Sequence, residues 1–275
     1  MNMQSMLDGL AAVRGVVMAK SLADAVAFCG PPNDDSRLPR RSDQHWAETF
    51  STANVAPEQI RSFLSSCQLV HNERDYGPAA EIVNAFIKSE DFNPLVDIEN
   101  LALALREVTE RRLPQTVAAS TIAMLAKRSD KVFIWDELPE LVVRLSASAR
   151  LGETARSAWS GASVSYASYA EAYDDVMVEM RVSSAFQAAL QRFSDYLASI
   201  AGPFRSRDVT PLDFIERRLA DRVLTYEGWY LRYWMETPDR KGKVAPADEG
   251  LLITRVVPNR GQDVFSTDLA AKYGY

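Results

Sequence analysis

Apolar residues recur along most of this chain at the spacing of a helix. In the run from 98 to 108 they follow one another at steps of three, four and three residues. The members of this set are Ile98, Leu101, Leu105 and Val108. Such steps place all four side chains on one helical face. Asp97 directly precedes the run and is predicted to cap it, because its carboxylate can accept the free N–H groups of a first turn.

Prolines stand at the start of several other apolar runs. A proline fits the first turn of a helix, because its φ is already helical and its missing N–H would have no partner there. These residues are Pro57, Pro78, Pro114 and Pro211, with Thr210 as the N-cap before the last of them. Further helices are expected over 3–28, 43–51, 137–149, 163–180 and 183–201, and Gly202 and Pro203 end the last one.

Strand character is confined to two short segments. Lys131–Trp135 reads KVFIW but lies between helical runs, and Leu251–Val257 reads LLITRVV after a charged loop. The chain shows no alternation of strands and helices, so a parallel sheet is not expected. The pattern predicts an all-α, multi-helix globular bundle that ends in a small irregular or β-hairpin tail.

The length of 275 residues suits one large domain. The proline-rich, charged stretch 30–41 is the best candidate for a linker, and a weaker boundary falls near 152–161. We expect a single helical domain over 1–275. The alternative is a division into an N-terminal helical segment 1–41, a helical core 42–236 and a C-terminal tail 237–275.

The overall charge limits the classes of partner. With 31 basic and 37 acidic residues the formal charge is -6, which argues against a surface coated with basic residues for general nucleic-acid binding. A local basic groove stays open, because net charge is a sum over the whole molecule. Asp8 and Arg14 interrupt the apolar start, which is therefore predicted as a helix of the fold rather than a secretory signal. No stretch is apolar enough for a membrane span, and we expect a cytoplasmic protein without membrane association.

Soft metal ligands are scarce. The full set of histidines and cysteines is His45, His71, Cys29 and Cys67, and its spacing fits no zinc signature. The chain also lacks a phosphate-binding glycine loop, a dinucleotide fingerprint and a nucleophile elbow. We therefore predict neither a metal nor a cofactor. Cys67 lies four residues before His71, which on a helix would make it either an activated thiol or a small core residue.

The segment 113–144 holds the one multi-residue pattern that points to a function. It reads LPQTVAASTIAMLAKRSDKVFIWDELPELVVR: a helix ends in a charged stretch, a short extended VFIW follows, and Asp136 opens the next helix. This order resembles the part of the helix-hairpin-helix DNA glycosylases of the 8-oxoguanine type that ends in their catalytic aspartate. It is also similar to bacterial helical proteins of related fold, in which a Ser-Lys pair precedes an aromatic–Asp step. Here Ser120–Thr121 and Trp135–Asp136 take those places.

The resemblance implies a glycosylase-like fold and a role for Asp136 as the catalytic carboxylate. Two features of the family are missing. LPQT replaces the glycine-rich hairpin that binds a DNA phosphate, and Val117 occupies the position of the lysine that forms a Schiff base. Thr121 likewise replaces the lysine of the bacterial relatives. Asp136 could then steer water or stabilise a cationic sugar, and its alternative role is that of an N-cap. Trp135 is predicted as a core anchor or a base-stacking residue.

Basic residues gather in two regions that could meet DNA phosphates. Candidate nucleic-acid ligands are Arg111, Arg112, Lys127, Arg128 and Lys131 around the key helix, and Arg217, Arg218 and Arg222 on a later one. Aromatic residues follow the second group at helical spacing: Tyr226, Trp229, Tyr230, Tyr233 and Trp234. This stripe is predicted either as core or as a platform for exposed bases. Under the core alternative, Arg217 and Arg218 lie on the solvated side or pair with Glu216 and Asp213.

A tyrosine stripe precedes an acidic cluster on another predicted helix. Tyr166, Tyr169 and Tyr173 step by three and four and are expected to be buried. Asp174, Asp175 and Glu179 follow, and the last two share a face that either binds a divalent cation or is simply solvated.

Three hypotheses for the function follow. The first is a DNA-interacting helical protein with a glycosylase-like fold, active or catalytically retired, in bacterial DNA repair or defence against foreign DNA. The second is a non-enzymatic interaction subunit of a multi-protein bacterial system. The third is a HEPN-like ribonuclease, because Arg40 and His45 have the Arg-x4-His spacing of that family.

Overall fold

The structure is a computed structural model that describes residues 3–29, 43–52, 54–66, 75–109, 115–150, 165–199 and 211–236. Within these ranges the regular elements are α-helices and no strand is present, which confirms the predicted all-α bundle. In chain order they are α1 (Met3–Cys29), α2 (Asp43–Ser51), α3 (Pro57–Ser66), α4 (Gly77–Lys88), α5 (Pro94–Val108), α6 (Thr116–Ala126), α7 (Glu137–Arg150), α9 (Tyr166–Arg181), α10 (Ser184–Ser199) and α11 (Leu212–Glu236). The predicted linker 30–41 and tail 237–275 lie outside the described residues.

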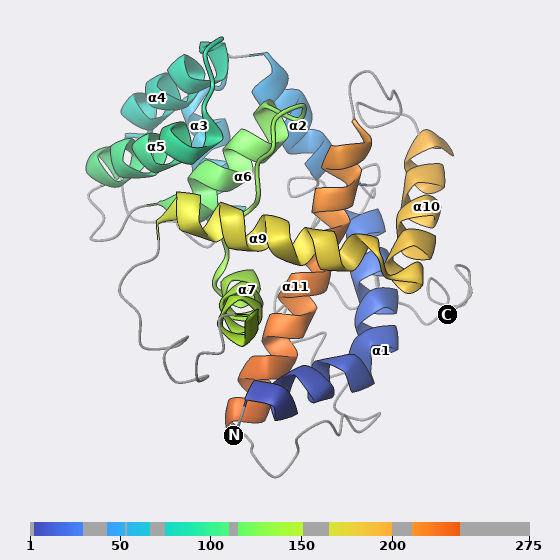
Figure 1. Ribbon diagram of the computed structural model, residues 1–275. Helices are drawn as coiled ribbons and strands as arrows, with labels where there is room; N and C mark the ends of the chain where they lie inside the picture. Colours follow the sequence, from blue (N-terminus) through green and yellow to red (C-terminus); the bar gives the residue numbers. More distant parts are fainter. Residues whose placement is uncertain are drawn as a thin grey trace.

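The long helix α11 organises one half of the molecule. It packs against α7 and α1 along much of its length and also contacts α10 and α9 (Figure 1). Helices α2 to α6 form a second group at the top of the same view, in which α5 lies on α6 and α4 lies on α5. Contacts of α9 with α5 and α7, and of α2 with α6 and α1, join the two groups. None of the described helices is both long and apolar enough to cross a bilayer.

The start of α5 differs from the prediction. The helix begins at Pro94, one turn before the expected start, and its N-cap is Asn93. The Asn93 side chain accepts a hydrogen bond from the N–H of Leu95 at 3.1 Å, and Asp97 accepts one from the N–H of Asn93 at 2.7 Å. Asp97 is therefore the reciprocal partner within the first turn rather than the cap, which is the logic of a capping box.

The predicted apolar faces form the core. On α5 the face of Ile98, Leu101 and Leu105 is buried, as its spacing indicated. The tyrosine stripe of α9 is buried too, so that prediction is confirmed. On α11 the aromatic stripe lies in the core or packs against it: Tyr226, Tyr230 and Trp234 are buried, and Trp229 and Tyr233 are partly buried. The stripe is thus mainly core, rather than a surface platform for bases.

The KVFIW segment is extended but forms no strand. It connects α6 to α7 through the interior, and Val132, Phe133 and Ile134 are buried. A backbone that crosses an interior outside a helix or sheet needs hydrogen-bond partners from elsewhere. Side chains of neighbouring helices supply them, as described for the candidate site below.

Gly228 marks the closest approach between α11 and α7. A Cβ atom at this position would lie far inside van der Waals distance of the backbone carbonyl of Leu138. Because the obstacle is backbone rather than a flexible side chain, the two helices would have to separate. Only glycine therefore permits the observed packing of α7 on α11.

We expect Gly228→Ala to destabilise the protein by about 3 kcal/mol or more, because overpacking against fixed backbone forces a shift of two helices. The matched control is Gly15→Ala in α1, where a Cβ would meet nothing within 4 Å. That substitution should stabilise the protein by roughly 0.5–1 kcal/mol, because alanine is the better helix former. Urea unfolding followed by circular dichroism measures both. Equal stabilities of the two variants would contradict the close packing.

Candidate functional site

A buried network of charges connects α11 to α2. The guanidinium of Arg218 donates through Nε to Oδ2 of Asp43 and through Nη2 to Oδ1 at 3.0 Å. Its Nη1 donates to Oδ2 of Asp221 at 2.5 Å. All three residues are buried, with at most 5% of their surface exposed. Moving two charges out of water costs solvation free energy, and their attraction offsets that cost only in close, hydrogen-bonded geometry. The two-point contact between Arg218 and Asp43 has this geometry.

Arg222 extends this network to α1. It donates through Nε to Oδ2 of Asp221 at 3.0 Å and forms an ion pair with Asp24 at 3.3 Å. Burial by itself would lower the pKa of Arg218, but the charges of Asp43 and Asp221 together raise the pKa above its usual value. Both guanidinium groups therefore stay protonated. The buried thiol of Cys29 contacts Asp43 at 3.5 Å, and burial together with that carboxylate raises its pKa well above the usual value.

Asp136 lies at the edge of this network. Its Oδ1 accepts a hydrogen bond from the N–H of Glu137 at 2.6 Å, and its carbonyl accepts one from the N–H of Glu140 at 3.0 Å. Asp136 thus caps α7, and its side chain remains partly exposed. Burial raises the pKa of Asp136, the negative charge of Asp221 raises it further, and Arg222 opposes the rise. Perturbed pKa values of this kind cluster at functional sites, although structural charge networks perturb them too.

The segment that carries Asp136 is fixed by side chains of α9 and α6. Tyr166 exchanges two hydrogen bonds with the backbone of Phe133, at 2.9 and 3.0 Å, and the Tyr169 hydroxyl donates to the carbonyl of Ile134 at 2.7 Å. Ser120 Oγ accepts the N–H of Trp135 at 2.9 Å. The two halves of the sequence pattern, the Ser120 pair and the Trp135–Asp136 step, are therefore in direct contact.

Trp135 packs as a core anchor with a polar edge. Its ring stacks on Tyr169 at a centroid distance of 5.0 Å, and its Nε1 donates to Glu140 at 3.0 Å. It is only partly buried and packs against the core cluster. With its ring face on Tyr169 and its N–H bonded, it fixes the backbone directly before Asp136.

Two orphan polar atoms lie inside the same region. Neither Oδ1 of Asp221 nor the hydroxyl of Tyr173 has a hydrogen-bond partner among the described residues, although both are buried. The charge of Asp221 contributes to the raised pKa of Tyr169, Tyr173 and Asp136, after burial itself. Asp221 is therefore the electrostatic centre to which these three groups respond.

The predicted basic ligands next to the key helix have internal roles. Lys127 donates to the carbonyls of Ile87 at 3.0 Å and Ser89 at 2.5 Å. It therefore supplies hydrogen bonds to carbonyl groups at the C-terminal end of α4. Arg128 is partly buried, and its Nη1 donates to the carbonyl of Leu125. Lys131 is the most exposed of the three and pairs with Asp174 at 2.6 Å. Arg111 and Arg112 lie outside the described residues.

The arginines predicted on α11 are not on the surface. Arg217 donates to the carbonyls of Asp130 at 2.5 Å and Arg128 at 3.1 Å, and only 4% of it is exposed. The expectation that Arg217 and Arg218 lie on the solvated side or pair with Glu216 and Asp213 is wrong. Glu216 instead receives a two-point contact from Arg181 at 2.7 to 3.0 Å. Arg217, Arg218 and Arg222 all bind groups within the protein, because α11 is central and its polar side faces other helices.

The remaining candidate groups stay apart. Asp175 and Glu179 both contact Arg150, at 2.8 and 3.8 Å, so the guanidinium group of Arg150 already pairs with both carboxylates. Across the described ranges no cluster of three or more His, Cys, Asp or Glu residues could hold a metal ion. His45 packs edge-on against Trp46 at 4.7 Å. Its predicted partner Arg40 lies outside the described residues, as do Cys67 and His71.

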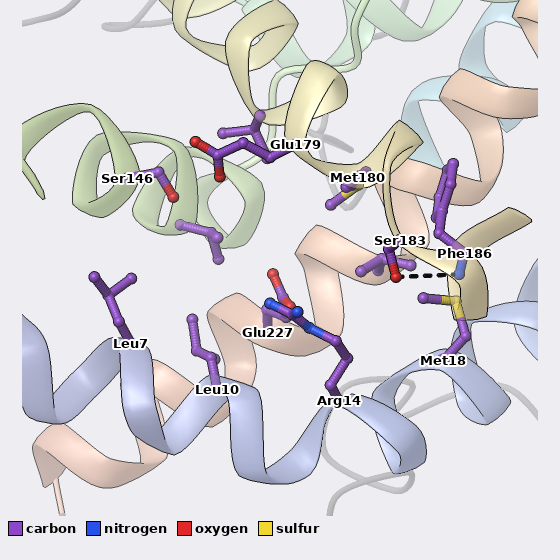
Figure 2. A pocket seen from close by; sticks show the side chains of 13 residues that line it. Leu7, Leu10, Arg14, Met18, Ser146, Glu179, Met180, Ser183, Phe186 and Glu227 are labelled. Atoms are coloured by element: carbon purple, nitrogen blue, oxygen red, sulfur yellow. Dashed lines mark hydrogen bonds between the residues drawn. The ribbon is translucent and has the colours of Figure 1, made fainter. Parts of the chain in front are cut away.

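A cavity of about 270 Å³ opens between α1, α7, α9, α10 and α11. Figure 2 shows Glu227 of α11 in the space between these helices, with Arg14 of α1 extending towards it. Apolar side chains form most of the wall: Leu7, Leu10, Met18, Val142, Val176, Met180, Phe186 and Val223. Burial raises the pKa of Glu227 to about 7, although the positive charge of Arg14 lowers it. A carboxyl group that is half ionised at neutral pH and faces a cavity is a strong candidate for function.

Sequence reasoning missed the residues that matter most in these two places. Asp24, Asp43 and Asp221 were not singled out, and neither was Glu227. Glu227 lies among apolar positions of α11, so an acid on the core-facing side was the available signal there, whereas Asp221 lies between Arg218 and Arg222. Asp43 and Asp24 pair with arginines 175 and 198 residues away, and a single sequence does not show that proximity.

We expect Asp43→Ala and Arg218→Met each to cost about 3–5 kcal/mol of unfolding free energy, because each leaves a buried charge without its partner. The double variant should cost clearly less than the sum of the two. Urea unfolding of all four proteins gives the coupling energy. Asp174→Asn serves as control, since its exposed pair with Lys131 should contribute no more than about 1 kcal/mol. Additive losses at Asp43 and Arg218 would contradict the network.

Glu227 should make stability depend on pH. Its pKa rises from 4.5 to about 7 on folding, so the folded state holds the proton longer and stability falls as the pH rises through that window. Removing the charge by Glu227→Gln should therefore raise stability by roughly 2–3 kcal/mol at pH 8 and have little effect at pH 5. Thermal and urea unfolding at both pH values measure the difference. Glu171→Gln on the exposed side of α9 is the control and should follow the unmodified protein.

Comparison with known proteins assigns no family. No protein-family model, no curated protein and no solved structure matches this chain. The candidate sites therefore rest on the chain's own residues. One is the partly exposed carboxyl group of Asp136 at the start of α7, beside the buried charge network. The other is the Glu227 cavity, which α7 and α11 help to line.

Proposed function

We propose that the protein binds DNA through the face that carries residues 127–136, with Asp136 as the carboxylate closest to the bound strand, in DNA repair or in defence against foreign DNA. One observation carries the proposal. Asp136 is held at the start of α7, partly exposed, at the end of an extended segment whose backbone is fixed by Ser120, Tyr166 and Tyr169. Rigid presentation of a single carboxylate is what an aspartate acting on a bound strand requires.

The order of elements supports the same proposal. Helix α6, the extended segment and Asp136 at the mouth of α7 follow one another as in the glycosylase pattern that this stretch resembles. The hydrogen bond from Trp135 N–H to Ser120 Oγ, at 2.9 Å, joins the Ser120–Thr121 pair to the Trp135–Asp136 step, the two parts of the pattern that resembles the bacterial helical proteins. Burial and the charge of Asp221 raise the pKa of Asp136.

The chemistry available to Asp136 is limited. Val117 replaces the lysine that would form a Schiff base, so the strand would not be cleaved by that route. A carboxylate can still stabilise the positive charge that develops on a sugar when a base leaves, and it can orient water. Any base removal by this chain would therefore leave an intact strand that breaks only on treatment with alkali.

The contact surface for phosphates is small. Among the predicted ligands that the structure describes, Lys131 is the most exposed, and its pair with Asp174 is a surface pair that DNA phosphates can displace. Arg128 is partly exposed beside it. Two or three phosphate contacts correspond to an affinity that falls about ten- to fortyfold between 50 and 200 mM salt.

The test is a fluorescence anisotropy titration with labelled intact duplex, duplex with 8-oxoguanine or an abasic site, and single-stranded DNA at both salt concentrations. Lys131→Gln should weaken binding to all of them and reduce the slope of log affinity against log salt by about one. Asp136→Asn should tighten binding a few-fold at low salt, because it removes a negative charge beside the phosphates. Asp97→Asn, an acid that also bonds backbone at a helix start, is the matched control and should change neither quantity.

Alkali treatment of the intact duplex, the 8-oxoguanine duplex and the single-stranded DNA after incubation separates binding from base removal. Alkali-labile breaks that disappear with Asp136→Asn but persist with Asp97→Asn would make Asp136 a catalytic residue. Binding without breaks would assign a non-enzymatic DNA-binding role. Absent or salt-independent binding to every one of these DNAs overturns the proposal and leaves an interaction subunit as the remaining hypothesis.

A further inference from the structure

The Glu227 cavity presents two opposite charges that act on each other through space without forming an ion pair. Glu227 is only 7% exposed, and neither it nor Arg14 forms a hydrogen bond or an ion pair with any residue that the structure describes. Figure 2 shows Arg14 reaching from α1 towards Glu227 on α11 across the cavity. A buried carboxyl group without a partner is costly to maintain and is therefore a sign of a binding site rather than of stability.

The walls select for an apolar body. Two methionines, a phenylalanine, two leucines and three valines surround the charged pair, and methionine adapts readily to the shape of a ligand. The volume of about 270 Å³ equals roughly nine water molecules at about 30 Å³ each. That space suits a molecule the size of a branched or aromatic amino acid and is too small for a nucleotide with its phosphates.

We propose that this cavity binds a small zwitterion with an apolar body, such as a hydrophobic α-amino acid, with its ammonium group on Glu227 and its carboxylate on Arg14. The two protein charges then gain partners without having to meet. A guanidinium binds a carboxylate through two parallel hydrogen bonds, and a carboxylate accepts from an ammonium group. The side chain of the ligand would fill the apolar part of the cavity.

Other charges near the cavity do not compete for these roles. Glu179 of α9 also lines it, but Arg150 of α7 contacts Glu179 at 3.8 Å. The lining residue from α10 is Phe186, and α7 contributes Val142 and Ser146. Arg14 and Glu227 are therefore the two lining charges without such a contact among the described residues.

Ionisation of Glu227 sets the pH dependence. The ammonium group needs the ionised carboxylate, and the pKa of Glu227 is about 7 before the ligand binds. The ionised fraction rises about tenfold between pH 6 and pH 8, so the affinity should rise by up to about tenfold over that range.

Isothermal titration calorimetry of the whole protein with L-leucine, L-phenylalanine and L-methionine at pH 8 tests the proposal. At least one of them should bind, and its analogues should show which charge matters: 3-methylbutylamine lacks the carboxylate, and 4-methylpentanoate lacks the ammonium group. Each analogue of leucine should bind about ten- to a hundredfold more weakly, as expected for the loss of a charged hydrogen bond.

Variants identify the two contacts. Arg14→Gln, on an exposed part of α1 where folding should not suffer, should weaken amino-acid binding about ten- to a hundredfold and leave the weak binding of 3-methylbutylamine unchanged or improved. Glu227→Gln should weaken amino-acid binding similarly and abolish its dependence on pH. Arg61→Gln on the exposed side of α3 is the control. The proposal is overturned if none of the three amino acids binds, if the amine or the acid alone binds as tightly as leucine, or if Arg14→Gln has no effect. None of these results depends on DNA binding.

Discussion

The burial of two arginines on α11 is the constraint on which the rest of the structure depends. Arg218 and Arg222 lie inside the molecule, where an unpaired guanidinium would cost several kcal/mol. The carboxylates that compensate them come from α2, α1 and α11 itself: Asp43, Asp24 and Asp221. Because Asp43 and Asp24 are far from the arginines in sequence, their pairing fixes the positions of α2 and α1 on α11. The bound charges thus specify one arrangement of helices that apolar contacts alone would define less strictly.

The same helix also controls the segment that carries Asp136. Arg217 binds the backbone of residues 128 and 130 just before it, and Gly228 lets α7 pack directly on α11 just after it. Tyrosines of α9 satisfy the carbonyls of Phe133 and Ile134 in between. An extended segment without a sheet is thereby held as firmly as a strand would be. The negative charge of Asp221 then acts on the carboxyl group at its end.

The groups of this protein best placed for binding or chemistry are two carboxyl groups. Asp136 and Glu227 differ in how they are presented: the first is partly exposed on a rigid turn, and the second lies in an apolar cavity opposite Arg14. Burial raises the pKa of both. One is suited to meet a strand at the surface, the other to enclose a small molecule. Both lie on the α7–α11 pair, so a ligand at Glu227 would contact the two helices that position Asp136.

The sequence by itself determined the helices. Apolar spacing, prolines and capping residues are local signals, and they correctly predicted the all-α class and the buried tyrosine stripe. They left the aromatic face of α11 open between core and a surface platform. The same signals could not decide whether Asp97 is the N-cap of α5 or the partner of the N-cap Asn93, since either side chain can accept a hydrogen bond from a backbone N–H.

Only the tertiary structure decided where the charges lie. From composition, Arg217, Arg218 and Arg222 looked like a solvated or phosphate-binding cluster, yet each has partners inside the protein. Glu227 gave no sequence signal beyond its apolar neighbours, and its pKa depends on Arg14, more than 200 residues earlier. The physical reason is that helix formation follows from neighbours along the chain. Burial and pairing of a charge follow from neighbours in space.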